Sequence, residues 1–552
     1  MLEYFPTESS RSDETGSVTN PSLLLYGKRL YKDQSPCEFL VELLLLVFSP
    51  KKVNDGDVVS DALPPLTSDA CSWTKLQYSP KARLNLKLFS FLGASQLETR
   101  HASHREHYQE LVDNLKSCID INGASQEEDV VRTLTNLFMG FQGAGGGRTW
   151  CAQSFLPVSP AFLAGETIWS ESKAKKLSSQ NWCDLLSNLS SVFNMTQHLF
   201  LARGGELLYL QVCNALRQSS ESIGQWCDGD DLGFTDNERD PAWLRESLNQ
   251  AFGQLREKSC PKTLTEIAEL IDVGLEDETA SYTDIDRKDQ ANRYVEAGYC
   301  NADSWREGYL FAVELRRLLT AKLDIMDRLA LLETACCMQV LRALASQSAR
   351  VTKQADAPDT GLGYLLALSA PDEVQPAVRR LSQQSVKDIR KMIFASLRVE
   401  EILDEVKASA EHASGKQKSL ESIYKNADDA YGWKLFTSLA KRIGLIVPKR
   451  SAGARFVLNE QLLRYLVVTI VPHNGRLTYD TFKKQLKSRH GLVLDAVGLN
   501  KANLESKKQG LHLPADIDKW LLTMLEGAGF LVQLSDSCAL VHNPIDNGGD
   551  GK

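Results

Sequence analysis

The pattern of apolar and polar positions in the first 155 residues combines helical stretches with one strand-like stretch. Ser35, Pro36 and Glu38 begin a predicted helix that runs to about residue 48, because serine caps, proline suits the first helical position and glutamate completes a capping box. Residues 83–88 alternate with a period of two, which predicts a half-buried strand. Helical spacing returns over 98–119 and 129–139. The pattern predicts a mixed α/β N-terminal domain over 1–155.

Residues 156–415 have mainly helical spacing and predict a helical domain. The apolar positions recur every three or four residues, which is typical of amphipathic helices packed in a bundle. The predicted helical stretches are 205–216, 241–255, 263–271, 305–348 and 375–410. A charged segment with serine and glycine at 412–418 is typical of a linker.

The C-terminal part, 420–545, contains a loose internal repeat that starts at Trp433 and again at Trp520. Each copy is an amphipathic helix that ends at a glycine, followed by a strand, a polar turn and a second strand, and glycine commonly ends helices. A helix followed by a hairpin is the rear half of a winged-helix unit, and helices suited to the front half lie at 460–471 and 479–489. We therefore expect a mainly α protein whose C-terminal region is a tandem winged-helix-like, DNA-binding region. Two unrelated helix-hairpins are the alternative.

Charge is distributed unevenly along the chain. The 552 residues carry a net charge of −8, which excludes a uniformly basic nucleic-acid coat protein. Residues 430–510 alone contain fifteen Lys and Arg against four Asp and Glu, a balance of +11 that leaves −19 for the remainder. Because Lys and Arg displace condensed counterions from nucleic acid, such a segment indicates a phosphate-binding surface.

Two groups of basic residues are the candidate contacts to DNA. Lys449, Arg450 and Arg455 bracket the tip of the first predicted hairpin, where a wing would touch the DNA backbone or the minor groove. The second group lies on the 479–489 helix, a candidate recognition helix, and comprises Lys483, Lys484, Lys487 and Arg489. The alternatives are a solvated basic face, or a surface that docks the acidic remainder of this chain or an acidic partner protein.

The stretches Gly-Leu-Ile-Val-Pro-Lys-Arg at 444–450 and Gly-Ala-Arg-Phe-Val-Leu at 453–458, together with the large helical body, resemble uncharacterised accessory components of bacterial anti-phage defence operons. Methylation-associated defence systems are one such setting. The resemblance covers about 125 C-terminal residues and carries over no catalytic residue. It implies a non-catalytic role: recognising invading DNA, or bridging it to other proteins of the same system, such as a separate methylase, ATPase or nuclease.

The other motifs in the sequence are weak evidence for an enzyme. The glycine-rich segment 140–149 lacks the spacing and the lysine of a phosphate loop, although its Arg148 is a possible anion contact. The histidines at 101, 104 and 107 lie in a polar stretch typical of a solvated helix face. Asp495, Glu505 and Lys507 echo a metal-dependent nuclease, but that motif needs a buried strand and this segment is polar. We expect no metal or other cofactor. The nuclease, and a scaffold for acidic partner proteins, are the alternative functions.

The apolar and cysteine content predicts a cytoplasmic protein that does not contact a membrane. The densest apolar run, 39–48, is too short to cross a bilayer and contains a glutamate. The first 21 residues are polar and lack the order of a signal peptide. The twelve cysteines form no Cys-x-x-Cys pair, and the adjacent Cys336 and Cys337 are expected to be buried thiols.

Overall fold

The computed structural model is mainly helical, with several small sheets. Its described residues are those outside 1–2, 8–19, 28–29, 65–72, 142–153, 170–192, 195–203, 259–260, 274–293, 353–361, 413–418, 506–512, 536–537 and 548–552, outside most of 82–123, and outside the single positions 31, 55, 166, 167, 374, 451 and 515. The described parts pack around one large set of buried apolar side chains that runs in sequence from Phe5 to Val541.

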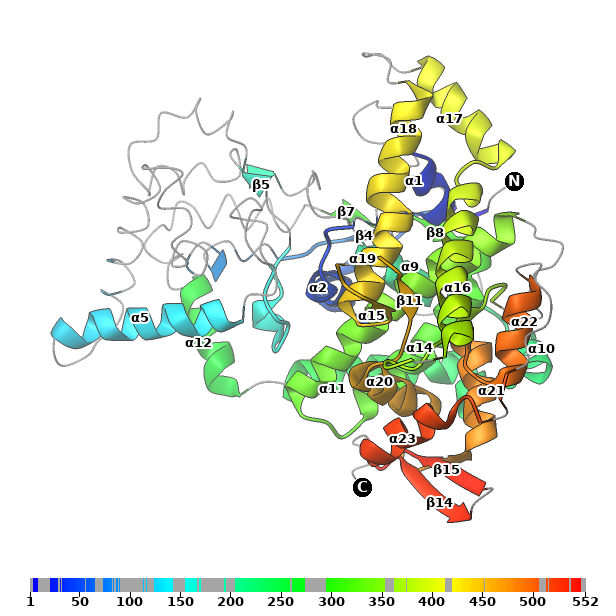
Figure 1. The fold of residues 1–552 in the computed structure, drawn as a ribbon. Helices are drawn as coiled ribbons and strands as arrows, with labels where there is room; N and C mark the ends of the chain where they lie inside the picture. The colour runs from blue at the N-terminus through cyan, green and yellow to red at the C-terminus, as the bar shows by residue number, and fades with distance from the viewer. Residues whose placement is uncertain are drawn as a thin grey trace.

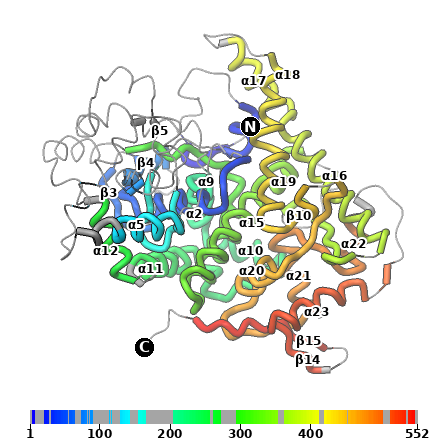
Figure 2. Tube along the Cα trace, turned by 60° about the vertical axis from the view of Figure 1, so that its left-hand side comes forward, coloured from blue at the N-terminus to red at the C-terminus, as the bar shows by residue number. Residues whose placement is uncertain are grey.

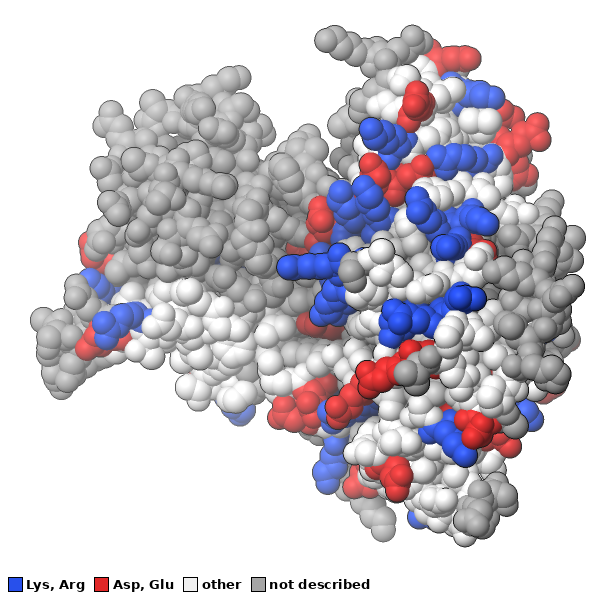
Figure 3. Space-filling view, in the orientation of Figure 1, with Lys and Arg blue, Asp and Glu red and all other residues white. Residues whose placement is uncertain are grey.

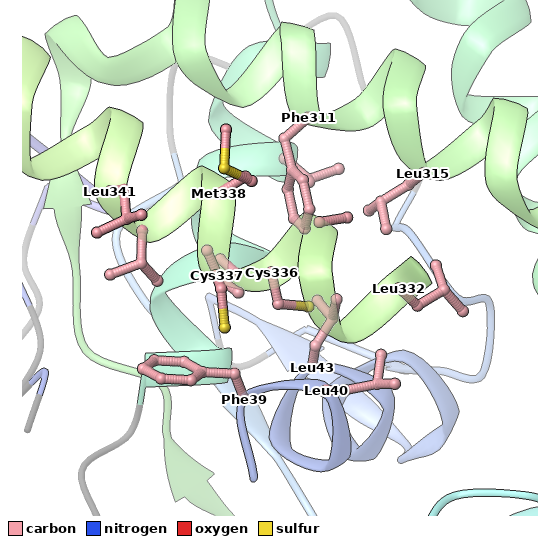
Figure 4. Packing of buried hydrophobic residues seen from close by; sticks show 14 of the residues in the cluster. Phe39, Leu40, Leu43, Phe311, Leu315, Leu332, Cys336, Cys337, Met338 and Leu341 are labelled. Atoms are coloured by element: carbon pink, nitrogen blue, oxygen red, sulfur yellow. The ribbon is translucent and has the colours of Figure 1, made fainter. Parts of the chain in front are cut away.

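The centre of the fold is α15 (Ile325–Thr352). On one side it meets α2 (Pro36–Phe48), α9 (Gly204–Leu216) and α14 (Trp305–Thr320), and on the other α16 (Pro376–Ser396) and α19 (Trp433–Arg442), as Figures 1 and 2 show. Figure 4 shows Cys336 and Cys337 of α15 among apolar side chains of α2 and α14. Both thiols are fully buried, as expected.

The predicted helical stretch 305–348 forms two helices, α14 and α15. Between α14 and α15, Ala321 bridges to Asn547, and the side chain of Asp324 accepts a hydrogen bond of 2.9 Å from the backbone N–H of Met326. A capped start of this kind ends the continuity of the helical pattern. α15 has the length and apolar composition of a membrane span, but 89% of its most apolar window is buried inside the protein. This burial is consistent with a soluble protein.

The capping box predicted at residue 35 is present. The Ser35 hydroxyl accepts from the backbone N–H of Glu38, and the Glu38 carboxylate accepts from that of Ser35. The strand predicted over 83–88 is wrong, because Leu86, Lys87 and Phe89 are helical in the structure. Leu86 and Phe89 are buried three residues apart, which fits one helical face. The helix predicted at 98–119 lies almost wholly outside the described residues.

Small sheets join the beginning of the chain to its middle. A four-stranded sheet has the order β3 (Val58–Val59), β2 (Lys51–Val53), β4 (Leu76–Tyr78), β7 (Val295–Glu296), all antiparallel. Likewise, β1 (Tyr4–Phe5) pairs with β8 (Cys300–Asn301). β5 (Ile168–Trp169) pairs with β6 (Phe193–Asn194). The remaining helices of this half are α1 (Pro21–Tyr26), α5 (Ala124–Gly140), α10 (Ser220–Gly229), α11 (Pro241–Lys258) and α12 (Lys262–Val273).

The C-terminal part contains both predicted hairpins. After α19, β10 (Ile446–Val447) pairs antiparallel with β11 (Arg455–Phe456). The second hairpin pairs β14 (Leu531–Ser535) with β15 (Cys538–His542) after α23 (Lys519–Gly527), and β12 (Arg476–Thr478) joins β15 on its other edge. Before and between these hairpins lie α17 (Glu400–His412), α18 (Leu420–Asn426), α20 (Glu460–Ile470), α21 (Tyr479–His490) and α22 (Ala496–Glu505). β13 (Leu492–Val493) pairs in parallel with β9 (Leu366–Ala367).

A close approach of α14 and α9 depends on a glycine. A Cβ added to Gly308 would overlap the backbone carbonyl oxygen of Gln211 and lie 2.8 Å from its carbonyl carbon. We expect Gly308→Ala to force these two helices apart and to lower the free energy of unfolding by about 3 kcal/mol. In α11, a Cβ at Gly253 would meet nothing within 4 Å. Gly253→Ala is therefore the matched control and should stabilise by about 0.5–1 kcal/mol. Thermal unfolding followed by circular dichroism measures both, and equal midpoints would contradict the prediction.

Buried ion pairs fix α14 against its neighbours. Arg342 of α15 donates to both carboxylate oxygens of Glu314, at 2.9 and 2.7 Å, and the Tyr465 hydroxyl of α20 donates to the same carboxylate at 2.8 Å. All three side chains are almost fully buried. Burial by itself would raise the pKa of Glu314, but the Arg342 guanidinium outweighs burial and the pKa falls to about 2. Glu314 is therefore ionised throughout the physiological pH range.

A second buried arginine, on α14, forms an ion pair and also bonds to the end of α20. Arg317 donates to both carboxylate oxygens of Glu238, at 2.8 and 2.6 Å. It also donates to the backbone carbonyls of Thr469 and Ile470, at 2.8 and 2.6 Å, where α20 ends. The C-terminal elements are thus joined to the helical body by buried charge as well as by apolar packing.

Candidate nucleic-acid interface

Helix α16 carries a basic stripe on its outer surface. Its buried positions include Val378, Leu381, Ile389 and Ile393, which lie on one side of the helix. The side opposite is exposed and basic, and its cations are Arg379, Arg380, Lys387, Arg390 and Lys391. Arg390 lies over the Phe394 ring, 5.1 Å from its centroid. None of the five has an ion-pair partner within the described part of the chain, so their charges face solvent.

The first hairpin packs beside this stripe. The Ser382 hydroxyl of α16 accepts from the backbone N–H of Phe456 at 2.8 Å and donates to its carbonyl at 3.1 Å. The Gln383 amide donates to the carbonyl of Gly453 at 3.3 Å. These bonds hold the loop between β10 and β11 against α16, and Lys449 and Arg450 of that loop are exposed.

We call the exposed cations of α16 together with Lys449 and Arg450 the basic face. Figure 3 shows Lys and Arg gathered in the middle of this side of the molecule, over the positions of α16, α19 and the first hairpin in Figure 1. α19 adds Lys434, which pairs with Asp429 at 2.7 Å, and the half-buried Lys441. Closely spaced cations of this kind make a surface suited to a polyanion.

Arg455, at the edge of the basic face, is partly withdrawn from solvent. It is half-buried and donates to the backbone carbonyl of Pro371 at 2.5 Å. Burial lowers the pKa of Arg455, and the neighbouring cation Arg379 lowers it further. Arg379 and Arg455 are therefore close enough for their charges to repel each other. Arg455 adds to the positive potential of this surface, but its guanidinium is held by the bond to Pro371.

The DNA-contact residues predicted on the 479–489 helix differ from one another in their surroundings. Lys483 pairs with Asp518 at 2.7 Å and with Asp480 at 3.1 Å. Lys484 is exposed and Lys487 is half-buried. These positions lie on α21, which packs against β13 and β15 and is a different helix from α16.

Arg489 lies in the protein interior and not on a surface that can meet DNA. It is fully buried, 3.6 Å from Glu314 and 5.5 Å from the centroid of the Phe234 ring. Burial lowers the pKa of Arg489 to about 10, and Arg317 adds to that effect. The adjacent His490 is also buried. Helix α21 therefore uses its last turn to dock on α14, which its sequence did not indicate.

The local charge of +11 is partly neutralised by residues outside the 430–510 segment. Besides Lys434, Lys483 and Arg489, whose partners Asp429, Asp518 and Glu314 lie outside it, Arg464 pairs with Asp327 at 2.9 Å. The predicted alternative, that basic residues dock the acidic remainder of the chain, therefore describes these four. The segment's exposed cations without an ion-pair partner in the described part of the chain include Lys449 and Arg450, which lie on the basic face, and Lys484, which lies on α21.

The cations of α16 were missed because the charge count began at residue 430. The signal was present in the sequence. All five basic residues of α16 lie on one side of the helix, opposite an apolar stripe. What the sequence did not show is that the first hairpin, some 70 residues later, packs against the same helix.

The other predicted sites give no second candidate. Arg148 lies outside the described residues, as do the histidines at 101, 104 and 107. Glu505 closes α22 instead of lying on a strand, and Lys507 is outside the described residues. Among the described residues, no group of three His, Cys, Asp or Glu side chains is arranged to hold a metal ion.

No protein-family model matches this chain, and neither a curated protein nor a solved structure shows significant similarity to it. The functional inference therefore rests on the geometry and charge described above.

Proposed function

We propose that this protein binds DNA through the basic face and does so without catalysing a reaction itself. The observation that supports this most is the set of exposed cations, free of acidic partners, that α16 and the β10–β11 loop bring to one surface. From Arg379 to Arg390 the helix rises about 16 Å, which matches about five phosphates of one duplex strand. Contacts of this type recognise the sugar-phosphate backbone and do not distinguish one base sequence from another.

We also propose that the last elements form one winged-helix unit. The order α20, β12, α21, α23, β14, β15, with β13 and α22 inserted between α21 and α23 and with β12 paired to β15, supports this assignment. In such a unit α23 occupies the recognition position, whereas the expected recognition helix, 479–489, is the second helix. The exposed positions of α23 include Lys519, which pairs with Asp516 at 2.9 Å, and Glu526. Because this helix has little free positive charge, we assign DNA binding to the basic face instead.

The role in an anti-phage defence system stays a prediction. In that setting a DNA-binding, non-catalytic chain would bridge DNA to partner proteins. The acidic side chains of α17, which begins Glu400-Glu401, lie at the far end of the molecule from α23 and offer a separate surface for such partners.

A salt titration of the full chain tests the proposal. With a fluorescent 20-base-pair duplex, we expect the logarithm of the binding constant to fall linearly with the logarithm of salt concentration, with a slope of about −4 to −5 for about five phosphates. Lys484→Ala/Lys487→Ala should leave both affinity and slope unchanged, because α21 lies outside the basic face. Absence of binding at 50 mM salt, or equal binding of poly-glutamate of matched charge, would overturn the proposal; the second result would favour a scaffold for acidic proteins.

A further inference from the structure

An open cavity of about 710 Å³ lies at the end of the basic stripe. Phe394 lines it from the last turn of α16, Arg398 from the turn between α16 and α17, Leu403 from α17 and Tyr424 from α18. The π-helix η6 (Ala427–Tyr431), which joins α18 to α19, completes the wall with Asp428 and Asp429. A volume of this size is ordinary for a small-molecule or cofactor site.

The cavity continues the basic face along the same helix. Arg390 of the basic stripe lies over the Phe394 ring, and Arg398, in the turn that follows α16, lies over the same ring. The exposed Lys425 of α18 also lines the cavity. A strand whose phosphates follow α16 would therefore bring its next nucleotide to the cavity.

The lining is suited to a flat, neutral, hydrogen-bonding group. Arg398 lies over the rings of both Tyr424 and Phe394, with its guanidinium carbon 4.9 and 5.8 Å from their centroids. The Tyr424 hydroxyl is buried and has no hydrogen-bond partner in the described part of the chain. A buried hydroxyl without a partner is unfavourable, and a bound group with a complementary polar atom would satisfy it.

The charges in the cavity discriminate between a base and a phosphate. Asp428 binds Arg398 at 2.6 Å, so the arginine charge is already compensated. Glu421 and Asp429 add two further carboxylates to the lining, of which Asp429 is itself paired with Lys434 at 2.7 Å. These carboxylates repel a phosphate but accept hydrogen bonds from the N–H groups of a nucleobase.

The π-helix is the local device that shapes this wall. π-Helical turns are rare and frequently occur at functional sites. The backbone N–H of Lys32 donates to the carbonyl of Ala430 at 3.0 Å, which ties the π-helix to the N-terminal segment. Asp428 and Asp429 are thus carried on a segment fixed from a distant part of the chain.

We propose that this cavity binds one unpaired nucleobase of the DNA strand held on the basic face. The inference rests on the proposed function and adds a base-binding site to a surface that otherwise contacts only phosphates. The base stacks on the aromatic and guanidinium surfaces, and its polar edge faces the tyrosine hydroxyl and the carboxylates.

The test is an abasic scan on the full, unaltered chain. A single-stranded 12-mer is compared with a series in which one abasic residue replaces each nucleotide in turn, so that every phosphate is kept. We expect loss of the base at one position, or at two adjacent ones, to weaken binding by about five- to a hundredfold. The salt slope should not change, because the phosphate contacts remain.

A variant assigns the effect to the cavity. In Tyr424→Phe, which keeps the ring and removes the hydroxyl, the penalty for the critical abasic position should fall by half or more, while Lys484→Ala should leave it unchanged. Uniform abasic penalties with intact salt-dependent binding would overturn the base site and leave the proposed function standing. If the single strand does not bind while the 20-base-pair duplex does, the base site fails and the proposed function stands; if neither binds, both fail. Because the scan uses the wild-type protein, the test does not depend on any variant folding.

Discussion

Replacing Glu314 by alanine is expected to destabilise the protein by about 3–5 kcal/mol. The carboxylate is fully buried and accepts from Arg342 and Tyr465, and Arg489 lies 3.6 Å away. Removing the carboxylate leaves two buried guanidinium groups without a counter-charge in a medium that solvates them poorly. Since Glu314 joins α14 to α15, α20 and α21, its loss should loosen the attachment of the C-terminal elements to the helical body.

The matched control is an exposed ion pair between two of the same helices. Asp327 of α15 pairs with Arg464 of α20 at 2.9 Å, with both side chains open to solvent. Asp327→Ala should therefore cost at most about 1 kcal/mol. Urea unfolding followed by tryptophan fluorescence compares the two variants. Equal and small losses would show that the buried pair contributes no more than a surface pair.

Reversing three charges on α16 should reduce DNA affinity by about a hundredfold or more at 100 mM salt. The triple variant Arg380→Glu/Lys387→Glu/Lys391→Glu changes exposed positions along one side of the helix. Each substitution removes a cation and places a carboxylate where a phosphate would lie. The slope of the salt dependence should fall in magnitude by about three.

The control reverses the same number of charges elsewhere. Arg256, Lys262 and Lys484 are all exposed and lie on α11, α12 and α21. Changing the three to glutamate gives the same net charge without touching the basic face. Fluorescence anisotropy with one duplex compares the two variants. A similar loss in both would indicate that the overall charge of the protein, and not the basic face, governs binding.

Local sequence signals predicted the elements well where the chain supplied its own caps and periodicity. The capping box at Ser35 and the helices of the 375–410 and 460–489 regions are present within a few residues of their expected ends. The alternation at 83–88 misled because apolar residues at Leu86 and Phe89 also fit a helical face, and a short run does not distinguish the two periods.

The sequence by itself determined the helical class, the two hairpins and the basic character of the C-terminal part, because these depend on residues near one another in the chain. Only the tertiary structure decided which cations are free. Lys483 and Arg489 find carboxylates supplied by other elements, whereas α16 and the distant β10–β11 loop meet and leave their cations unpaired. A charge count along the chain cannot separate the two cases, since ion pairing and desolvation depend on neighbours in space.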